Sequence, residues 1–593
     1  MEGTHKIFAP KLTHFFEQRS HGYYYCPKIL PTIRYKTTNS KIMSTSTTKY
    51  RRSAGYKPSI WNLEFLIDES SKRDRYVHQP DDEYVNIVKR LKCEVKNLMV
   101  DEELEPLVIF KIVGEIQRLG LGDYFGKDIE SALRRLACKF GDLELDLHAT
   151  ALGFTLLRQS GIFISQDIFK QFMDENENFK PSLCNDKEGM ISLYEASYFG
   201  FEGEHLLVKA KAFTKEYLLS NNNNHSKQED KLIVDDDVNH TLGLALRYRM
   251  PKLEARLYIE THPKDVETAL LQLAMLDFNR AQLMYQQDLH ELARWWKDLE
   301  LSEKLSFARD RLMECLFWGI GTLPKPELSS GRKALTRVFK FITIIDDIYD
   351  VYGTIDELEL FTNAIERWNI NAIDELPDYM KVTFLALYNT VNEIGYEILK
   401  QKGFNCIPYL KRSWEDMTKA FLVEAKWLQN SQTPTFEEYL NNGWVSVSGV
   451  VALTHIFFFV SPQITPEALH CLRNNHDILR LPSMVFRLSN DLATSEAEIE
   501  RGETANAISC YAKEKGVTMK DARKHLSNLI DESWKKLNEI QVLNDTPFSV
   551  DFVEAAMNLA RTAQCAYQHG DGHGSPELIK KKILSLIVDP IHL

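Results

Sequence analysis

The sequence predicts an all-α protein that is built from two helical domains. Apolar residues recur at three- and four-residue spacing over residues 82–99, 106–121 and 128–140, as in helices that bury one face. No sustained strand alternation or β-hairpin signal interrupts this pattern. Glycine (27 residues) and proline (20 residues) are both used less than average, which suits long helices with short connections.

The chain divides into three parts by composition. Residues 1–50 hold eight Lys and Arg, two acidic residues and twelve Ser and Thr, which is typical of an organelle transit peptide. A disordered tail is the alternative for this segment. A polar loop over residues 220–237 separates two helices, and a second helical block begins near residue 265. We therefore expect a transit peptide over 1–50, one helical domain over 51–268 and another over 269–593.

Charge, cysteine usage and hydropathy exclude several classes of function. The net charge is −12 and the pI is near 5.9, so nucleic acid is not an expected partner. The nine cysteines are scattered, without a C-x-x-C pair or a His/Cys cluster, which indicates a reducing compartment and no zinc site. The longest apolar run, residues 449–460, is too short to span a bilayer and contains His455. It predicts a buried helix, and no membrane span is expected.

The segment "FITIIDDIYDVYG", residues 341–353, places three aspartates at the end of an apolar helix. Residues four apart share a helix face, so Asp346 and Asp350 are expected on one side, with Asp347 at its edge. The helix macrodipole is already negative at this end, and carboxylates there are disfavoured unless a cation binds them. Hard oxygen ligands on one face are typical of Mg²⁺ or Mn²⁺ sites, with a solvated helix end as the alternative.

A second polar helix face follows in "RLSNDLATSEAEIERGE", residues 487–503. Asn490, Thr494 and Glu498 stand at i, i+4 and i+8, each offset by about 40° from the one before, so their oxygens face one side. Alone, this pattern is equally consistent with a polar face that carries salt bridges. Together with the aspartates, it predicts two facing sets of oxygen ligands for a metal cluster.

Candidate anion-binding groups accompany both acidic segments. Arg309 and Arg311 precede the aspartates in the chain, and Arg487 lies one turn before Asn490. Guanidinium groups suit bidentate recognition of diphosphate, and surface salt bridging is the alternative for each of them. Trp318 follows the two arginines, and tryptophan is the best cation–π partner, although most buried tryptophans are core residues.

These elements together resemble the D-D-x-x-D and N-S-E/D-T-E metal motifs and the R-x-R element of class I plant terpene synthases. The resemblance covers almost the whole chain after residue 50. "RRSAGYKPSIW" is similar to the R-R-x₈-W signature of the monoterpene synthase subfamily, with Arg51, Arg52 and Trp61 matching. The resemblance implies an inactive, barrel-like helical N-terminal domain, a helical class I catalytic domain and a plastid location. No D-x-D-D motif occurs, so cyclisation initiated by protonation is not expected.

The resemblance also implies a role for each candidate residue. Three Mg²⁺ ions, or Mn²⁺, would be held by Asp346, Asp350, Asn490, Thr494 and Glu498, with Asp347 in a supporting role. The diphosphate of a prenyl diphosphate substrate would be received by Arg309, Arg311 and Arg487. Trp318 would stabilise the allylic carbocation that ionisation leaves behind.

Two segments resemble lids over the active site of that family. "YQHGDGHG", residues 567–574, is similar to the C-terminal lid and carries Asp571 and His573 as catalytic candidates, with a plain glycine-rich turn as the alternative. Arg51 and Arg52 are implicated in closing the site from the N-terminal side. A lid would exclude water from the cation.

The expected product depends on two phenylalanines. Phe339 lies seven residues before Asp346 and Phe486 one turn before Asn490, so helical phase places both beneath the metal ligands. With Asn506, they match three of four positions typical of plant isoprene synthases. The fourth is Val447, where those enzymes carry serine. We therefore favour an acyclic monoterpene such as ocimene or myrcene from geranyl diphosphate, with isoprene from dimethylallyl diphosphate as the alternative; both phenylalanines could also be plain core residues.

Two other functions compete with this interpretation. Chain-elongating prenyltransferases resemble this chain in fold but generally carry two aspartate-rich motifs, whereas the second motif here consists of Asn, Thr and Glu. A catalytically inactive helical paralogue is the alternative of another class, although every metal position holds a competent ligand. For the assembly, we expect a monomer or a weak homodimer.

Overall fold

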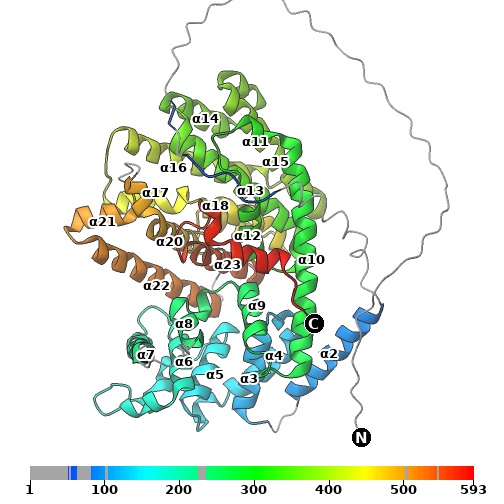
Figure 1. Cartoon of the computed structure of the whole chain (residues 1–593), viewed down its shortest axis with the longest axis vertical. Helices are drawn as coiled ribbons and strands as arrows, with labels where there is room; N and C mark the ends of the chain where they lie inside the picture. The colour runs from blue at the N-terminus through cyan, green and yellow to red at the C-terminus, as the bar shows by residue number, and fades with distance from the viewer. Residues whose placement is uncertain are drawn as a thin grey trace, which may run out of the picture. The chain divides into compact units, whose positions relative to one another are not determined.

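The computed structural model describes residues 51–52, 55–62, 82–100, 104–224, 236–500, 505–543 and 546–592. Within these ranges the regular elements are helices, apart from one isolated antiparallel bridge between Met173 and Phe179 (Figure 1). The prediction of an all-α fold is confirmed. The expected transit peptide, residues 1–50, lies outside the described residues.

The first group of helices surrounds one hydrophobic core. Its fully buried side chains include Phe110, Leu133 and Phe154. The α-helices are α2 (Asp82–Val100), α3 (Pro106–Arg118), α4 (Gly122–Ala137), α5 (Leu147–Gln159), α6 (Lys187–Ser197), α7 (His205–Asn224), α8 (Asp236–Gly243) and α9 (Pro251–Thr261). Short 3₁₀ turns connect them: η2 (Phe140–Asp142), η3 (Gln166–Phe172), η4 (Pro181–Asn185) and η6 (Leu246–Tyr248).

The second group surrounds a larger core that contains Trp318, Trp414 and Trp534. Its α-helices are α10 (Thr268–Leu299), α11 (Leu301–Lys304), α12 (Leu312–Thr322), α13 (Ser329–Asp347), α14 (Ile355–Arg367), α15 (Asp378–Lys402), α16 (Ile407–Gln429), α17 (Phe436–Ser446), α18 (Gly449–Val460), α19 (Pro466–Arg473), α20 (Asp477–Glu500), α21 (Ala507–Lys515), α22 (Met519–Leu543), α23 (Val550–Tyr567) and α24 (Lys580–Ile583). The shorter turns are η7 (Pro326–Leu328), η8 (Ile348–Tyr352), η9 (Ile370–Glu375), η10 (Pro576–Leu578) and η11 (Leu584–Val588).

Helix α10 belongs to both cores. Leu270 and Phe278, near its N-terminus, pack in the first core, whereas Tyr285 and Trp296, further along, pack in the second. The helix begins where Glu267 accepts hydrogen bonds from the backbone N–H groups of the first turn. The expected boundary between residues 268 and 269 therefore coincides with the start of a helix that both cores share, and it stays a prediction.

The segment Phe436–Val460 is long and apolar enough to cross a membrane, judged by length and composition alone. The structure divides it into α17 and α18 at Ser448, which adopts a left-handed backbone conformation with φ of 72°. In its most apolar window, 83% of the residues are buried inside the protein. The buried helix predicted over 449–460 is α18, a core helix of this protein.

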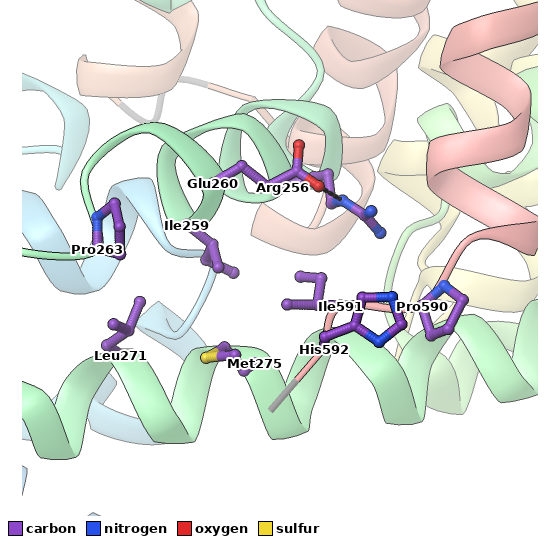
Figure 2. A pocket seen from close by; sticks show the side chains of 9 residues that line it. All are labelled: Arg256, Ile259, Glu260, Pro263, Leu271, Met275, Pro590, Ile591 and His592. Atoms are coloured by element: carbon purple, nitrogen blue, oxygen red, sulfur yellow. Dashed lines mark hydrogen bonds and ion pairs between the residues drawn. The ribbon is translucent and has the colours of Figure 1, made fainter.

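The C-terminal tail contributes to a cavity of about 310 Å³ that lies away from the predicted site residues. Figure 2 shows Arg256 and Ile259 from α9, Met275 from α10, and Ile591 and His592 from the tail around this cavity. Every residue that lines it belongs to α9, α10, the turn between them or the tail.

Candidate active site

The three aspartates stand where α13 changes its helical repeat. The α-helix ends at Asp347, and residues Ile348–Tyr352 continue as a π-helical turn, closed by a bond from the N–H of Gly353 to the carbonyl of Ile348 (2.8 Å). A side chain at Gly353 would collide with Leu358 and with that carbonyl, so glycine permits the wider turn. The repeat of 3.6 residues therefore ends at Asp347, and the shared face expected for Asp346 and Asp350 stays a prediction.

Arg309 binds two of the aspartates. Its backbone N–H and its Nε donate to the carboxylate of Asp347 at 2.6 and 2.8 Å, and its Nη2 donates to Asp346. Asp347 is fully buried, and burial raises its pKa to about 6 although Arg309 opposes that shift. The Asp346 side chain keeps 31% of its surface exposed. Asp347 thus fits the supporting role expected for it, while Asp346 remains accessible.

The oxygens on α20 lie along one face, in the order that the sequence predicts. The hydroxyl oxygen of Thr494 lies 2.5 Å from a carboxylate oxygen of Glu498 and 3.0 Å from the carbonyl of Asn490, and both compete for its single proton. Arg487 lies one turn earlier, with its Nη1 at 3.5 Å from the side-chain oxygen of Asn490. An amide, a hydroxyl and a carboxylate are therefore adjacent on a single helix.

Tyr567, the last residue of α23, interacts with groups from both sets of expected oxygen ligands. Its hydroxyl forms a hydrogen bond with Asn490, and its pKa, raised by burial, is also raised by the negative charges of Asp571 and Asp346. Within the ranges described above, no three Asp, Glu, His or Cys side chains gather closely enough to hold a metal ion. Two of the expected ligands, Asn490 and Thr494, carry an amide and a hydroxyl and so do not count toward such a group, and Asp346 is hydrogen-bonded to Arg309. The donor set itself, all hard oxygens, fits a divalent cation of the Mg²⁺ type.

Arg487 is held in place by α17. Its Nε donates to the carbonyl of Gly443 at 3.0 Å and its Nη2 to the hydroxyl of Ser446 at 2.7 Å. Val447, the next residue, is 7% exposed and ends the helix. Asn506 is the buried N-cap of α21, where its side-chain oxygen accepts from the N–H of Ser509 (2.9 Å). Its contact with a substrate stays a prediction.

A cluster of aromatic rings lies under these polar groups. The ring of Trp318, on α12, has its centroid 5.5 Å from Phe339, 4.6 Å from Phe486 and 6.0 Å from Tyr567. Phe486 and Tyr567 are 6.1 Å apart. Helical phase predicted both phenylalanines beneath the expected metal ligands. In the structure, Phe339 on α13 and Phe486 on α20 both pack against Trp318. Their effect on the product stays a prediction.

The segment of residues 51–52 and 55–62, here called the strap, contacts the catalytic helices. Arg51 forms a bidentate ion pair with Glu357 of α14, at 2.9 and 2.8 Å, and Arg52 donates to the backbone carbonyl of Asp350. The indole of Trp61 donates to the buried carboxylate of Glu314 at 2.7 Å. The three residues of the R-R-x₈-W signature are therefore all bound to the catalytic domain.

Arg311 holds the two candidate lids together. This fully buried guanidinium donates to the carbonyl of Lys57 in the strap (3.0 Å) and to the carbonyls of His573 and Gly574 (3.2 and 3.1 Å). A fourth bond goes to the carbonyl of Asp310 at 3.1 Å. Carbonyl oxygens thus occupy its Nε and both terminal nitrogens, so its direct contact with diphosphate stays a prediction.

His573 is half-buried, and its surroundings favour the neutral imidazole. Its Nε2 lies 2.9 Å from the hydroxyl of Thr343, which already donates to the carbonyl of Phe339, so Nε2 carries the proton and donates. Burial lowers the pKa of His573 well below the usual range, and Arg309 and other cations lower it further. The Nδ1 atom has no hydrogen-bond partner among the described residues.

Asp571 supports the backbone of the lid. Its carboxylate accepts from the N–H groups of His573 (3.2 Å) and Gly574 (2.8 Å). A side chain at Gly574 would collide with this carboxylate, and one at Gly572 with the carbonyl of Ala566. The segment therefore needs glycine at both positions, and Asp571 stabilises its backbone conformation.

Sequence reasoning missed several residues of the site. Glu314 and Glu357 receive Trp61 and Arg51, and the ring of Tyr56 lies 4.8 Å from the guanidinium carbon of Arg309. Tyr56 stands within the R-R-x₈-W match, which could have pointed to it. The acceptors of long-range hydrogen bonds carry no local sequence signal.

Comparisons with known proteins agree with this geometry. The terpene synthase family metal binding domain matches residues 297–536, and the terpene synthase N-terminal domain matches residues 60–242. A tricyclene synthase from Medicago truncatula, named as chloroplastic, is 49% identical over 91% of this chain and 92% of its own length. That name supports the plastid location.

Two solved structures are also similar. The isoprene synthase from grey poplar leaves (Populus x canescens), in complex with three Mg²⁺ ions and dimethylallyl-S-thiolodiphosphate, is 44% identical with a TM-score of 0.81, over 90% of this chain and 99% of that one. A limonene synthase with 2-fluorolinalyl diphosphate is 38% identical with a TM-score of 0.85, over 92% of this chain and 100% of that one. The chain belongs to the terpene synthase family, in the group of plant monoterpene and isoprene synthases, and it is a lyase of that family.

Proposed function

We propose that this enzyme ionises geranyl diphosphate and releases an acyclic monoterpene such as ocimene or myrcene. The observation that carries the proposal is the cluster of Trp318, Phe339, Phe486 and Tyr567 next to two sets of oxygen ligands. Polar groups that hold a diphosphate would thereby adjoin an aromatic surface that stabilises a cation. Bulky rings leave little room for a longer chain to fold back on itself.

The metal ions are proposed to bind between α13 and α20. Asp346, Asp350, Asn490, Thr494 and Glu498 would hold three Mg²⁺ ions or Mn²⁺, in line with the grey poplar enzyme, whose complex contains three Mg²⁺ ions. When bound, the ions supply positive charge that stabilises the departing diphosphate.

The arginines of the chain would share in binding the diphosphate. Arg309 contacts Asp346 through a terminal nitrogen, and Arg487 is fixed by α17 beside Asn490. Both guanidinium groups are therefore oriented by other contacts before a substrate arrives. Arg311 would act by keeping the strap and the C-terminal lid together over the site, which excludes water from the cation.

His573 is the proposed proton acceptor. An allylic cation becomes a neutral alkene when it loses a proton, and this step needs a base that is not already protonated. Burial and neighbouring cations lower the pKa of His573, which favours its neutral form, and its Nδ1 is without a hydrogen-bond partner among the described residues. A proton accepted at Nδ1 would place a positive charge beside Arg309 and Arg311, which favours its rapid release once the diphosphate has left.

Isoprene formation from dimethylallyl diphosphate is the second candidate. It is favoured by Phe339, Phe486 and Asn506, and by the 44% identity to an isoprene synthase that binds a dimethylallyl analogue. Val447 is the reason for keeping it second, since serine stands at this position in the isoprene synthase pattern.

Headspace gas chromatography with the C5, C10 and C15 diphosphates offered in parallel, with Mg²⁺ and then Mn²⁺, tests the proposal. We expect an acyclic C10 product to dominate, and released diphosphate to match it in amount. A dominant C5 product would establish the second candidate. A cyclic or C15 product would refute both, and Val447→Ser tests whether this position shifts the balance toward isoprene.

A further inference from the structure

Two arginines lie in contact with each other outside the candidate active site. Arg247, in the turn η6, is 3% exposed, and Arg561 lies on α23. The Nε of Arg561 donates to the backbone carbonyl of Arg247 at 3.0 Å. Their guanidinium carbons lie 5.7 and 5.8 Å from the ring centre of Trp534. Both side chains line a cavity of about 1230 Å³.

The hydrogen-bond partners of both guanidinium groups are neutral. Arg247 donates from Nε to Asn538 at 2.9 Å and from Nη2 to Gln541 at 2.6 Å. Arg561 donates from Nη1 to Asn558 at 2.7 Å. Across the described ranges, neither arginine forms an ion pair with a carboxylate. Arg247 is buried and Arg561 is half-buried, and charges in such surroundings are normally paired, so two adjacent unpaired ones are unusual.

Another arginine of the same cavity provides a contrast. Arg249 is also buried, and it pairs with Glu254 at 3.0 Å and with Glu195 at 3.7 Å. Near Arg561, the acidic group that acts on its charge is Glu554, and Lys325 lies 3.6 Å from that carboxylate. Arg249 therefore has acidic partners in this cavity, whereas Arg247 and Arg561 have none among the described residues.

The pKa values reflect this lack of negative charge. Burial lowers the pKa of Arg561 to about 10, and it lowers that of Arg247 too, which the charge of Arg561 depresses further. Both groups nevertheless stay protonated at neutral pH, because guanidinium is a very weak acid.

Each guanidinium also retains a terminal nitrogen for another acceptor. Nη1 of Arg247 and Nη2 of Arg561 form no hydrogen bond to any residue that the structure describes. Neither nitrogen is among the described side-chain atoms that are fully buried and lack a partner. Since both side chains line the cavity, these nitrogens are the donors that an anion in it would use.

We propose that Arg247 and Arg561 bind a phosphate-type oxyanion in this cavity. Two guanidinium groups with accessible N–H donors match the several acceptor oxygens of such an anion, and its charge would supply the missing partner. The ligand could be inorganic phosphate or the headgroup of a prenyl diphosphate. This site is separate from the candidate active site that the proposed function uses. Its two arginines come from η6 and α23.

Isothermal titration of the full chain with sodium phosphate, in EDTA, tests the proposal. We expect Arg247→Gln and Arg561→Gln each to weaken binding by about tenfold or more, since each removes a charge-assisted hydrogen-bond donor. The control is Arg280→Gln, which replaces an exposed arginine that lines the same cavity, and binding should be unchanged. Arg309→Gln should keep the phosphate binding that depends on Arg247 and Arg561, because Arg309 belongs to the other site.

A parallel titration with geranyl diphosphate, again without metal, separates the two sources of the ligand. Equal dependence on Arg247 and Arg561 for both probes indicates recognition of the phosphate group alone. Arg247→Lys retains the charge and serves if Arg247→Gln does not fold, and Arg561→Gln is an independent variant. Phosphate binding that is lost in Arg309→Gln and kept in Arg561→Gln, or no binding at all, would overturn the proposal.

Discussion

Replacing Arg51 with glutamine removes the ion pair that holds the strap against α14. The guanidinium of Arg51 binds both oxygens of Glu357, at 2.9 and 2.8 Å, and donates to the carbonyl of Tyr352 at 3.0 Å. It also lies 4.5 and 5.0 Å from the ring centres of Tyr352 and Tyr379. Tyr352 ends the π-turn that carries Asp350, so the contact joins the strap to the metal-binding segment.

The size of the effect follows from the partial burial of the pair. The side chains of Arg51 and Glu357 keep 25% and 15% of their surface exposed. Charge-assisted hydrogen bonds contribute about 1.5–3 kcal/mol, and solvent screening favours the lower part of this range. A loss of about 2 kcal/mol would shift the ratio of docked to undocked strap by roughly 30-fold. Turnover that requires a docked strap should then fall in Arg51→Gln.

The pH dependence has a definite sign. Burial alone would raise the pKa of Glu357, but the hydrogen bond from Arg51 lowers it to about 2. A carboxylate with a depressed pKa in the docked state stabilises that state at pH values above its ordinary pKa, and the contribution fades as the pH falls toward 2. Wild type and Arg51→Gln should therefore differ fully at neutral pH and converge in strap docking in acid.

Hydrogen exchange of the amides in residues 55–62, together with product formation, measures this coupling. Glu357 also caps α14 by accepting from the N–H of Thr354, and Glu357→Gln keeps an acceptor for that cap. A double-mutant cycle of Arg51→Gln and Glu357→Gln then isolates the ion pair. Lys57→Gln is the control, since this side chain in the same strap is 71% exposed. Strictly additive effects, or an equal effect of Lys57→Gln, would refute the reasoning.

Four further outcomes are expected. Asp346→Ala should lower diphosphate release at least 100-fold with helicity unchanged by circular dichroism, because it removes an accessible ligand at the end of α13. Phe339→Ala should cost about 3–5 kcal/mol in the free energy of unfolding and shift the product toward longer or cyclic terpenes, read by denaturant titration and gas chromatography. Trp61→Phe should lower the free energy of unfolding by about 1–3 kcal/mol in the same denaturant titration, because it leaves the buried carboxylate of Glu314 without its hydrogen-bond donor. Deleting residues 1–50 should leave a soluble, active enzyme, and a reporter fused to them should reach the plastid.

The helices themselves were predictable because burial of one face imposes its period on the sequence. The expected segments 82–99 and 106–121 correspond to α2 and α3. The third segment was predicted to begin at residue 128, but α4 begins at Gly122. Two glycines among its first five residues weaken the local preference for a helix, whereas burial of Phe125 against the core compensates for it. Tertiary packing decides such boundaries, and a local pattern does not contain it.

The candidate site was predictable where spacing along one helix fixes a shared face. Asn490, Thr494 and Glu498 obey this rule because α20 is regular at that point. A π-turn follows Asp347 and depends on the absence of a side chain at Gly353, so a regular helical repeat cannot be used to place Asp350, and its face stays a prediction. Arg311 shows a second limit: its carbonyl acceptors in residues 57 and 573–574 come from both ends of the chain, and backbone carbonyls exist at every residue.

The acidic end of α13 is itself stabilised by a cation of the protein. Three aspartates at the negative end of a helix should repel one another, yet Arg309 binds Asp347 through two N–H groups and Asp346 through one. The two aspartates are therefore unequal. Asp347 is buried and bound to Arg309, whereas Asp346 is partly exposed and would give up a single hydrogen bond on binding the proposed metal ion. The same arginine would then be released toward the diphosphate, so that metal binding at Asp346 and anion binding at Arg309 support each other.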